Sequence, residues 1–125
     1  TGGTLMGIAR KLRELNPEII VIGVEPTEQH HLSGLKNMRS QEKPDIFHED
    51  ELNEVVTVTD AQASYMTRAL AEEEGLIVGM SSGAAAYAAL TLVKKLDDGI
   101  VVTIFPDGGE RYLSTDLFVG GSRKA

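Results

Sequence analysis

The run Ile-Ile-Val-Ile-Gly-Val-Glu at positions 19–25 decides the fold class of this chain. It is an almost unbroken series of β-branched apolar residues, which is typical of a strand that a parallel sheet buries on both faces. Pro26 follows directly and ends the strand. Upstream, apolar residues recur at helical spacing over positions 5–15, and Asn16-Pro17 ends that helix.

The same alternation continues downstream. Residues 55–58 and 100–105 are further apolar, β-branched strand candidates. Residues 60–74 and 84–96 are helix candidates, and Asp60 is the expected N-cap of the first. Strands that alternate with helices of this length predict an α/β, three-layer domain with a mainly parallel sheet.

The composition limits the possible functions. A length of 125 residues supports one domain, which we expect over residues 1–118, with a flexible tail over residues 119–125. Lys and Arg number 12 against 19 Asp and Glu, for a net charge of −7, which argues against nucleic-acid binding. The chain has no cysteine and no apolar run of membrane-spanning length, so we expect a cytoplasmic protein that does not contact a membrane. Its three histidines lack metal-site spacing, so we predict no metal.

Three segments of unusual composition fall at the turns of this pattern. They are Thr1-Gly2-Gly3-Thr4, Gly-Met-Ser-Ser-Gly-Ala at 79–84, and Phe-Pro-Asp-Gly-Gly-Glu-Arg-Tyr-Leu-Ser-Thr at 105–115. In parallel sheets, ligands gather at the carboxyl ends of strands, where loops lead into helix N-termini. The first segment offers backbone N–H groups and two hydroxyls, which suits a small phosphate but not a dinucleotide.

Each segment also has a purely structural interpretation. The loop at positions 1–4 would equally serve close packing before a helix. Ser81-Ser82 would cap the alanine-rich helix. The charged residues of 107–111 would form a surface turn with a modest ion pair, an interpretation that we favour for Glu110 and Arg111.

Together the three segments resemble the pyridoxal-phosphate (PLP) enzymes of the cysteine synthase (O-acetylserine sulfhydrylase) family, in their B-type branch. The resemblance implies that Thr1-Gly2-Gly3-Thr4 holds the cofactor phosphate, that Ser81 hydrogen-bonds the pyridine nitrogen, and that Pro106 lines the ring. A serine hydroxyl, unlike an aspartate, does not hold that nitrogen protonated, which makes the ring a milder electron sink. Gly108 departs from the family, which usually has a serine there.

The resemblance covers only the C-terminal, large-domain part of a fold-type II PLP enzyme, so residues 1–118 would be an incomplete PLP-binding domain. The catalytic, Schiff-base lysine belongs to the missing N-terminal part, and no lysine here lies in a comparable motif. We therefore name no catalytic residue and expect this chain alone to be inactive. The parent enzyme, by resemblance a homodimer, would make L-cysteine by β-replacement on O-acetylserine or O-phosphoserine with a sulfur donor.

Other functions stay open. A serine or threonine dehydratase, a threonine synthase or a cystathionine β-synthase would use a related fold, and a non-catalytic phosphate-binding module would use the same loop. Lys36 lies where some B-type members carry an arginine that accepts O-phosphoserine, so we predict that Lys36 contacts the substrate's leaving group. A solvated loop cation is an equal alternative for Lys36.

Overall fold

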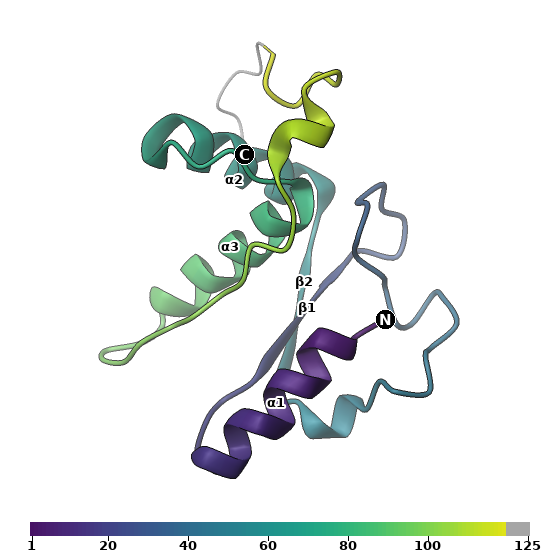
Figure 1. Ribbon diagram of the computed structural model, residues 1–125, viewed down its shortest axis with the longest axis vertical. Coiled ribbons are helices and arrows are strands. Elements are labelled where there is room, and N and C mark those ends of the chain that lie inside the picture. Colours follow the sequence, from purple (N-terminus) through teal and green to yellow (C-terminus); the bar gives the residue numbers. More distant parts are fainter. Residues whose placement is uncertain (120–125) are drawn as a thin grey trace.

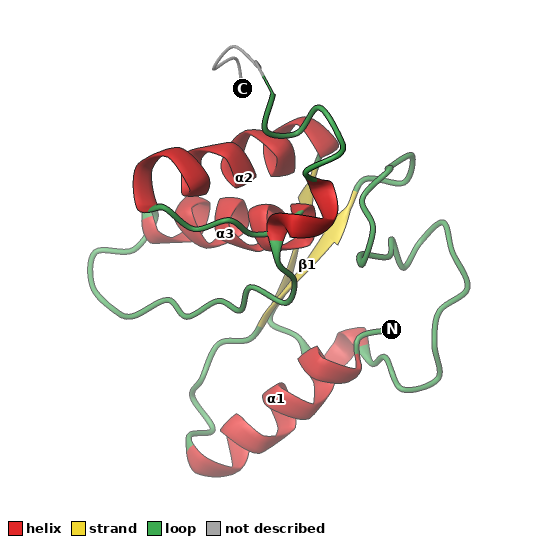
Figure 2. Cartoon of the chain, turned by 45° about the horizontal axis from the view of Figure 1, so that its top comes forward, coloured by secondary structure: helices red, strands yellow, loops and turns green. Residues whose placement is uncertain are grey.

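A computed structural model describes residues 1–119, which form a two-stranded parallel sheet between helices. The elements in chain order are α1 (Gly3–Leu15), β1 (Ile22–Pro26), the 3₁₀ turn η1 (Glu49–Glu51), β2 (Glu54–Val58), α2 (Asp60–Glu74), α3 (Met80–Val93) and the 3₁₀ turn η2 (Gly109–Tyr112). Helix α1 lies on one face of the sheet, and α2 and α3 lie on the other (Figures 1 and 2). The predicted α/β architecture with parallel strands is confirmed for this part of the chain.

The sheet presents different side chains to its two faces because successive residues of a strand point in opposite directions. Strand β1 pairs with β2 in parallel register, with Gly23 opposite Val55 and Val24 opposite Val56. A Cβ added at Gly23 would lie 3.4 Å from Leu5 of α1, so that side of the strand faces α1. Val24 and Val56 pack instead against the buried cluster shared with α2 and α3.

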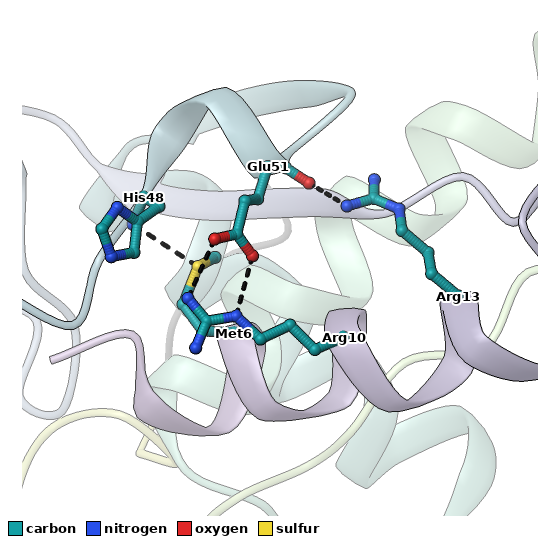
Figure 3. Close-up of polar contacts among 5 residues, drawn as sticks. All are labelled: Met6, Arg10, Arg13, His48 and Glu51. Carbon is teal, nitrogen blue, oxygen red and sulfur yellow. Dashed lines mark hydrogen bonds and ion pairs between the residues drawn. The ribbon is translucent and has the colours of Figure 1, made fainter.

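A set of polar contacts ties α1 to η1 (Figure 3). The guanidinium of Arg10 donates two hydrogen bonds of 2.9 Å to the carboxylate of Glu51. Arg13 donates to the backbone carbonyl of Glu51 and, over 2.8 Å, to Oδ1 of Asn53. That same oxygen accepts the backbone N–H of Val21 at 2.8 Å. The contacts fix the segment before β2 against both α1 and the start of β1.

Helices α2 and α3 pack closely, and a glycine makes this possible. A Cβ added at Gly83 of α3 would fall less than 3.0 Å from the Ala63 carbonyl oxygen and from Thr67 Oγ1. The interface also buries Ala84 and Ala88, which have small side chains. Short side chains on α3 thus allow the two helices to approach at backbone distance.

The helix starts differ from the prediction. The N-cap of α2 is Thr59 and not Asp60: Thr59 Oγ1 accepts the Gln62 backbone N–H at 3.2 Å, and the Gln62 side chain accepts the Thr59 N–H at 2.9 Å. This is a capping box, in which two otherwise unpaired donors are satisfied reciprocally. Helix α3 begins at Met80, four residues before the predicted start, so Ser81 and Ser82 belong to its first turn.

The prediction of a third strand at residues 100–105 is wrong. This segment is not hydrogen-bonded to any strand among residues 1–119, and Ile100 and Val102 are 92% and 83% exposed. The one bridge nearby joins Val78 to Gly108 in antiparallel orientation. The sheet is therefore smaller than expected. None of the described helices is long and apolar enough to cross a membrane. Most of the predicted tail, residues 120–125, lies outside the described residues.

Candidate functional site

The first loop of the chain caps α1 without using a side chain. Gly2 is the N-cap and has a φ of 82°, in the left-handed region that favours glycine. A Cβ at this position would also lie 2.8 Å from the Phe47 ring. Thr4 is exposed, and Thr1 Oγ1 accepts only a long hydrogen bond of 3.5 Å from the Gly3 N–H. The start of α1 therefore has no side-chain cap, and anion binding by its N–H groups stays a prediction.

The serine pair lies at the start of α3 and is buried. Ser81 and Ser82 are 4% and 0% exposed. Neither caps the helix, because the N-cap is Gly79 and the structure shows no side-chain cap there. The interpretation of these serines as N-caps is therefore wrong. Both hydroxyls point to the carboxylate of Asp107: Oδ1 accepts from Ser81 at 2.9 Å and from Ser82 at 2.8 Å.

The sequence alone does not decide whether Asp107 belongs to a functional site or to a surface turn. Besides the two serines, its Oδ2 accepts the Tyr112 hydroxyl at 3.4 Å. Its backbone oxygen accepts the Gly79 N–H at 3.1 Å, which ties the loop before η2 to the start of α3. Burial and the nearby Asp107 carboxylate raise the pKa of the Tyr112 phenol, so Tyr112 stays protonated and donates. The sequence signal for this role was the position of Asp107 directly after an apolar run.

The loop after β1 passes beside Ser81. A Cβ added at Gly34, which has a φ of 83°, would lie 3.8 Å from Ser81 Oγ. A hydrogen bond attaches this loop to the end of β1: the side chain of buried Asn37 donates to the Pro26 carbonyl at 2.8 Å. Lys36, the predicted substrate residue, is half-buried between Gly34 and Asn37. The sequence named Lys36 but missed Gly34, although a glycine in a loop is a signal for such a close approach.

One loop connects the two predicted cofactor segments. Its first half reaches Ser81 through Gly34, and its second half reaches the N-terminal loop, where Ile46 lies 3.4 Å from a Cβ built on Gly3 and Phe47 lies against Gly2. Pro106 is exposed and immediately precedes Asp107. The described residues include no ion pair at Glu110 or Arg111.

Comparisons with known proteins show the family of this chain. Residues 1–107 match the family described as pyridoxal-phosphate dependent enzyme. The chain belongs to that family. It is 46% identical to a cysteine synthase of Aquifex aeolicus, over 94% of this chain and 38% of that protein. It is 38% identical to an O-acetylserine dependent cystathionine beta-synthase of Bacillus subtilis, over 97% of this chain and 42% of that protein.

The fold comparison gives the same result. A crystal structure of a cysteine synthase from Entamoeba histolytica superposes with a TM-score of 0.89 at 34% identity, over 99% of this chain and 39% of that chain. The resemblance to cysteine synthases is thus confirmed, and the chain spans about 40% of the length of these relatives. It corresponds to part of a PLP-dependent enzyme of the cysteine synthase family.

Proposed function

We propose that this chain supplies the C-terminal part of a PLP-dependent cysteine synthase that makes L-cysteine by β-replacement. The substrate would be O-acetylserine or O-phosphoserine, and a sulfur donor would replace the acetate or phosphate. The observation that carries this proposal is the loop after β1, which passes both the start of α1, where no side chain caps the helix, and the buried Ser81. Relatives named as cysteine synthases over most of this chain support it.

The residues present fit the cofactor at both of its polar ends. The phosphate requires several donors, and Thr1, Gly2, Gly3 and Thr4 offer hydroxyls and N–H groups at the positive end of the α1 dipole. The pyridine nitrogen requires one hydrogen-bonding partner, which Ser81 would supply, and Pro106 would line the ring. When bound, PLP supplies the electron sink that lets the β-substituent of the amino acid depart.

The protein's own contribution is to hold and orient these groups. Helix α3 is fixed by its close contact with α2 at Gly83, which places Ser81 reproducibly. The start of α1, which has no side-chain cap, would retain the cofactor through its phosphate and hold the ring in place. The catalytic lysine would come from a part of the enzyme outside this chain, and we expect that enzyme to be a homodimer.

Lys36 would bind the leaving group. It lies two residues after Gly34, on the loop that passes Ser81. A lysine ammonium is a single point charge without the two-pronged geometry of arginine, so it would accept a phosphate without excluding the neutral acetyl ester. We therefore expect both O-phosphoserine and O-acetylserine as substrates.

Two assays on the full-length protein that contains this chain test the proposal. The purified protein should bind PLP and form cysteine from O-acetylserine and sulfide. Pyruvate from serine without added sulfur would indicate a dehydratase instead. A protein that binds no PLP would support the non-catalytic phosphate-binding alternative.

A second candidate concerns the nucleophile. One relative is named as an O-acetylserine dependent cystathionine beta-synthase, at 38% identity. Homocysteine would then replace sulfide as the acceptor at the same site. The comparison of kcat/KM for sulfide and homocysteine, with O-acetylserine held constant, distinguishes the two. A preference for homocysteine would make the protein a cystathionine-forming enzyme.

A further inference from the structure

The start of α1 packs against a segment that lies far along the chain. Phe47 is 8% exposed, and its ring occupies the space that a side chain at Gly2 would need: a Cβ built on Gly2 would lie 2.8 Å from Cδ2 of the ring. A Cβ built on Gly3 would lie 3.4 Å from Cδ1 of Ile46. Two apolar side chains therefore cover one side of the N-terminal loop.

The donors of the same loop are open to solvent. Thr1, Gly3 and Thr4 are exposed. The backbone N–H groups of Thr4 and Leu5 have no acceptor among residues 1–119, because the first N–H groups of a helix lack partners within it. An anion that approaches from solvent would meet these donors, whereas the side toward residues 46–47 is closed by apolar groups.

The two glycines do not fix the shape of this loop by themselves. Glycine adopts left-handed and right-handed backbone conformations with similar ease, and Gly2 has a φ of 82°. The Phe47 ring restricts Gly2 from outside, because it fills the space beside the Gly2 backbone. An apolar ring also excludes water from one side of the loop, which strengthens the interaction of nearby donors with an anion.

The segment that carries Phe47 is attached to α1 on both sides of the ring. The His48 backbone N–H donates to Sδ of Met6 at 3.5 Å, and the Glu51 carboxylate accepts two hydrogen bonds of 2.9 Å from Arg10 (Figure 3). Met6 and Arg10 are four residues apart and therefore lie on one face of α1. The ring is thus held in a defined place relative to the helix start that it covers.

We propose that Phe47 is a positioning residue for the cofactor phosphate. It holds the backbone of Gly2 and Gly3 so that the N–H groups and hydroxyls at the start of α1 converge on the open side of the loop. An aromatic ring has no donor for a phosphate oxygen, so Phe47 acts through the loop. The inference rests on the proposed function, in which this loop holds the phosphate of PLP.

The test uses the full-length protein loaded with PLP. The ³¹P chemical shift of the bound phosphate depends on its ionisation and its hydrogen bonds, and it is measured without turnover. Phe47→Ala should move this signal toward that of free PLP and raise the dissociation constant of PLP, measured by equilibrium dialysis, roughly 10-fold. Phe47→Leu keeps an apolar side chain beside Gly2 and should retain most of the wild-type signal and affinity.

Leu117→Ala is the matched control. Leu117 is also 8% exposed, but it lies on the segment after η2, away from the N-terminus (Figures 1 and 2). The variant should lower the Tm and leave the ³¹P signal and the PLP affinity unchanged. The same ³¹P change in Leu117→Ala and Phe47→Ala would overturn the proposal, because general loosening of the protein would then explain both.

Arg10→Gln covers the case in which Phe47→Ala does not fold, because Arg10 is a surface side chain. It frees the segment that carries Phe47 and should move the ³¹P signal in the same direction by a smaller amount. An unchanged signal in this variant would overturn the proposal. A wild type that binds no PLP would refute the proposed function and this inference with it. A wild type that binds PLP, with signal and affinity unchanged in Phe47→Ala, would refute only the inference.

Discussion

Replacing Gly83 with alanine tests whether α2 and α3 approach as closely as described. The added Cβ would lie less than 3.0 Å from both the Ala63 carbonyl oxygen and Thr67 Oγ1, and 3.0 Å from the Thr67 backbone nitrogen. Two of these three atoms belong to the backbone, so a side-chain rotation cannot relieve the overlap. The helices must separate.

The expected cost follows from two contributions. Overpacking of a well-packed interface costs typically 1–3 kcal/mol, and a separation of roughly 0.5–1 Å weakens each dispersion contact by a quarter to a half. Thr67 also donates to the Ala63 carbonyl at 2.8 Å, and the loss of this bond adds about 1 kcal/mol. Alanine is the better helix former by about 0.5–1 kcal/mol, which offsets part of this loss. Gly83→Ala should therefore destabilise the protein by about 1–3.5 kcal/mol, a large part of a typical folding free energy.

Urea unfolding of the full-length protein, followed by circular dichroism, measures this difference. Gly7→Ala is the control, because a Cβ at Gly7 would meet nothing within 4 Å and alanine is the better helix former by about 0.5–1 kcal/mol. It should be neutral or stabilising. Thr67→Ala should not rescue Gly83→Ala, because the Ala63 carbonyl remains in the way. Equal unfolding midpoints for wild type and Gly83→Ala would refute the close approach of the two helices.

Three further changes test other contacts. Thr59→Ala removes the capping box of α2 and should cost about 1 kcal/mol in urea unfolding, whereas Thr59→Ser should retain most of it; equal losses would contradict the cap. The Arg10 hydrogen bonds lower the pKa of the Glu51 carboxyl, so their stabilisation is present above the unfolded value of about 4.3 and is lost as the pH falls through the lowered folded value. Arg10→Gln should therefore lower the Tm at pH 6 and have less effect at pH 3, and an equal effect at both would refute the pairing. Lys36→Ala should reduce kcat/KM roughly 10–100-fold for O-phosphoserine and little for O-acetylserine, with Lys11→Ala as control; equal losses would show that Lys36 does not contact the leaving group.

The helices and the parallel strands β1 and β2 were predicted because their patterns depend on residues close together in the sequence. The apolar run at 19–25 forms β1 only from Ile22, and Pro26 is the last residue of the strand and does not follow it. Helical spacing predicted α1 to within two residues at its start. The start of α3 was missed for a physical reason. Gly-Met-Ser-Ser-Gly has the composition of a loop, yet Gly83 packs against α2 and holds these residues in a helical turn. A contact between distant segments overrode the local preference.

In the candidate site, too, local motifs were visible in the sequence but contacts between distant segments were not. Motifs predicted a role for Ser81 and for the N-terminal loop, but they did not predict the hydrogen bond from Ser81 to Asp107. Asp107 lies 26 residues away, and this hydrogen bond depends on the fold. A carboxylate in a polar turn has the same composition whether it faces solvent or collects three hydroxyls. Only the bridge between Val78 and Gly108, which brings the turn to the start of α3, distinguishes the two.

Residues 100–105 show where a strand prediction depends on more than its own sequence. Their β-branched pattern resembles that of β1, yet β1 has β2 beside it, while this segment has no neighbour among residues 1–119. A strand requires a partner for its backbone groups and a covering layer for its side chains. Ile100 and Val102 are 92% and 83% exposed, so neither requirement is met within the described residues. The pattern therefore specifies a strand that needs a neighbour, and the chain covers only about 40% of the length over which its relatives build their fold.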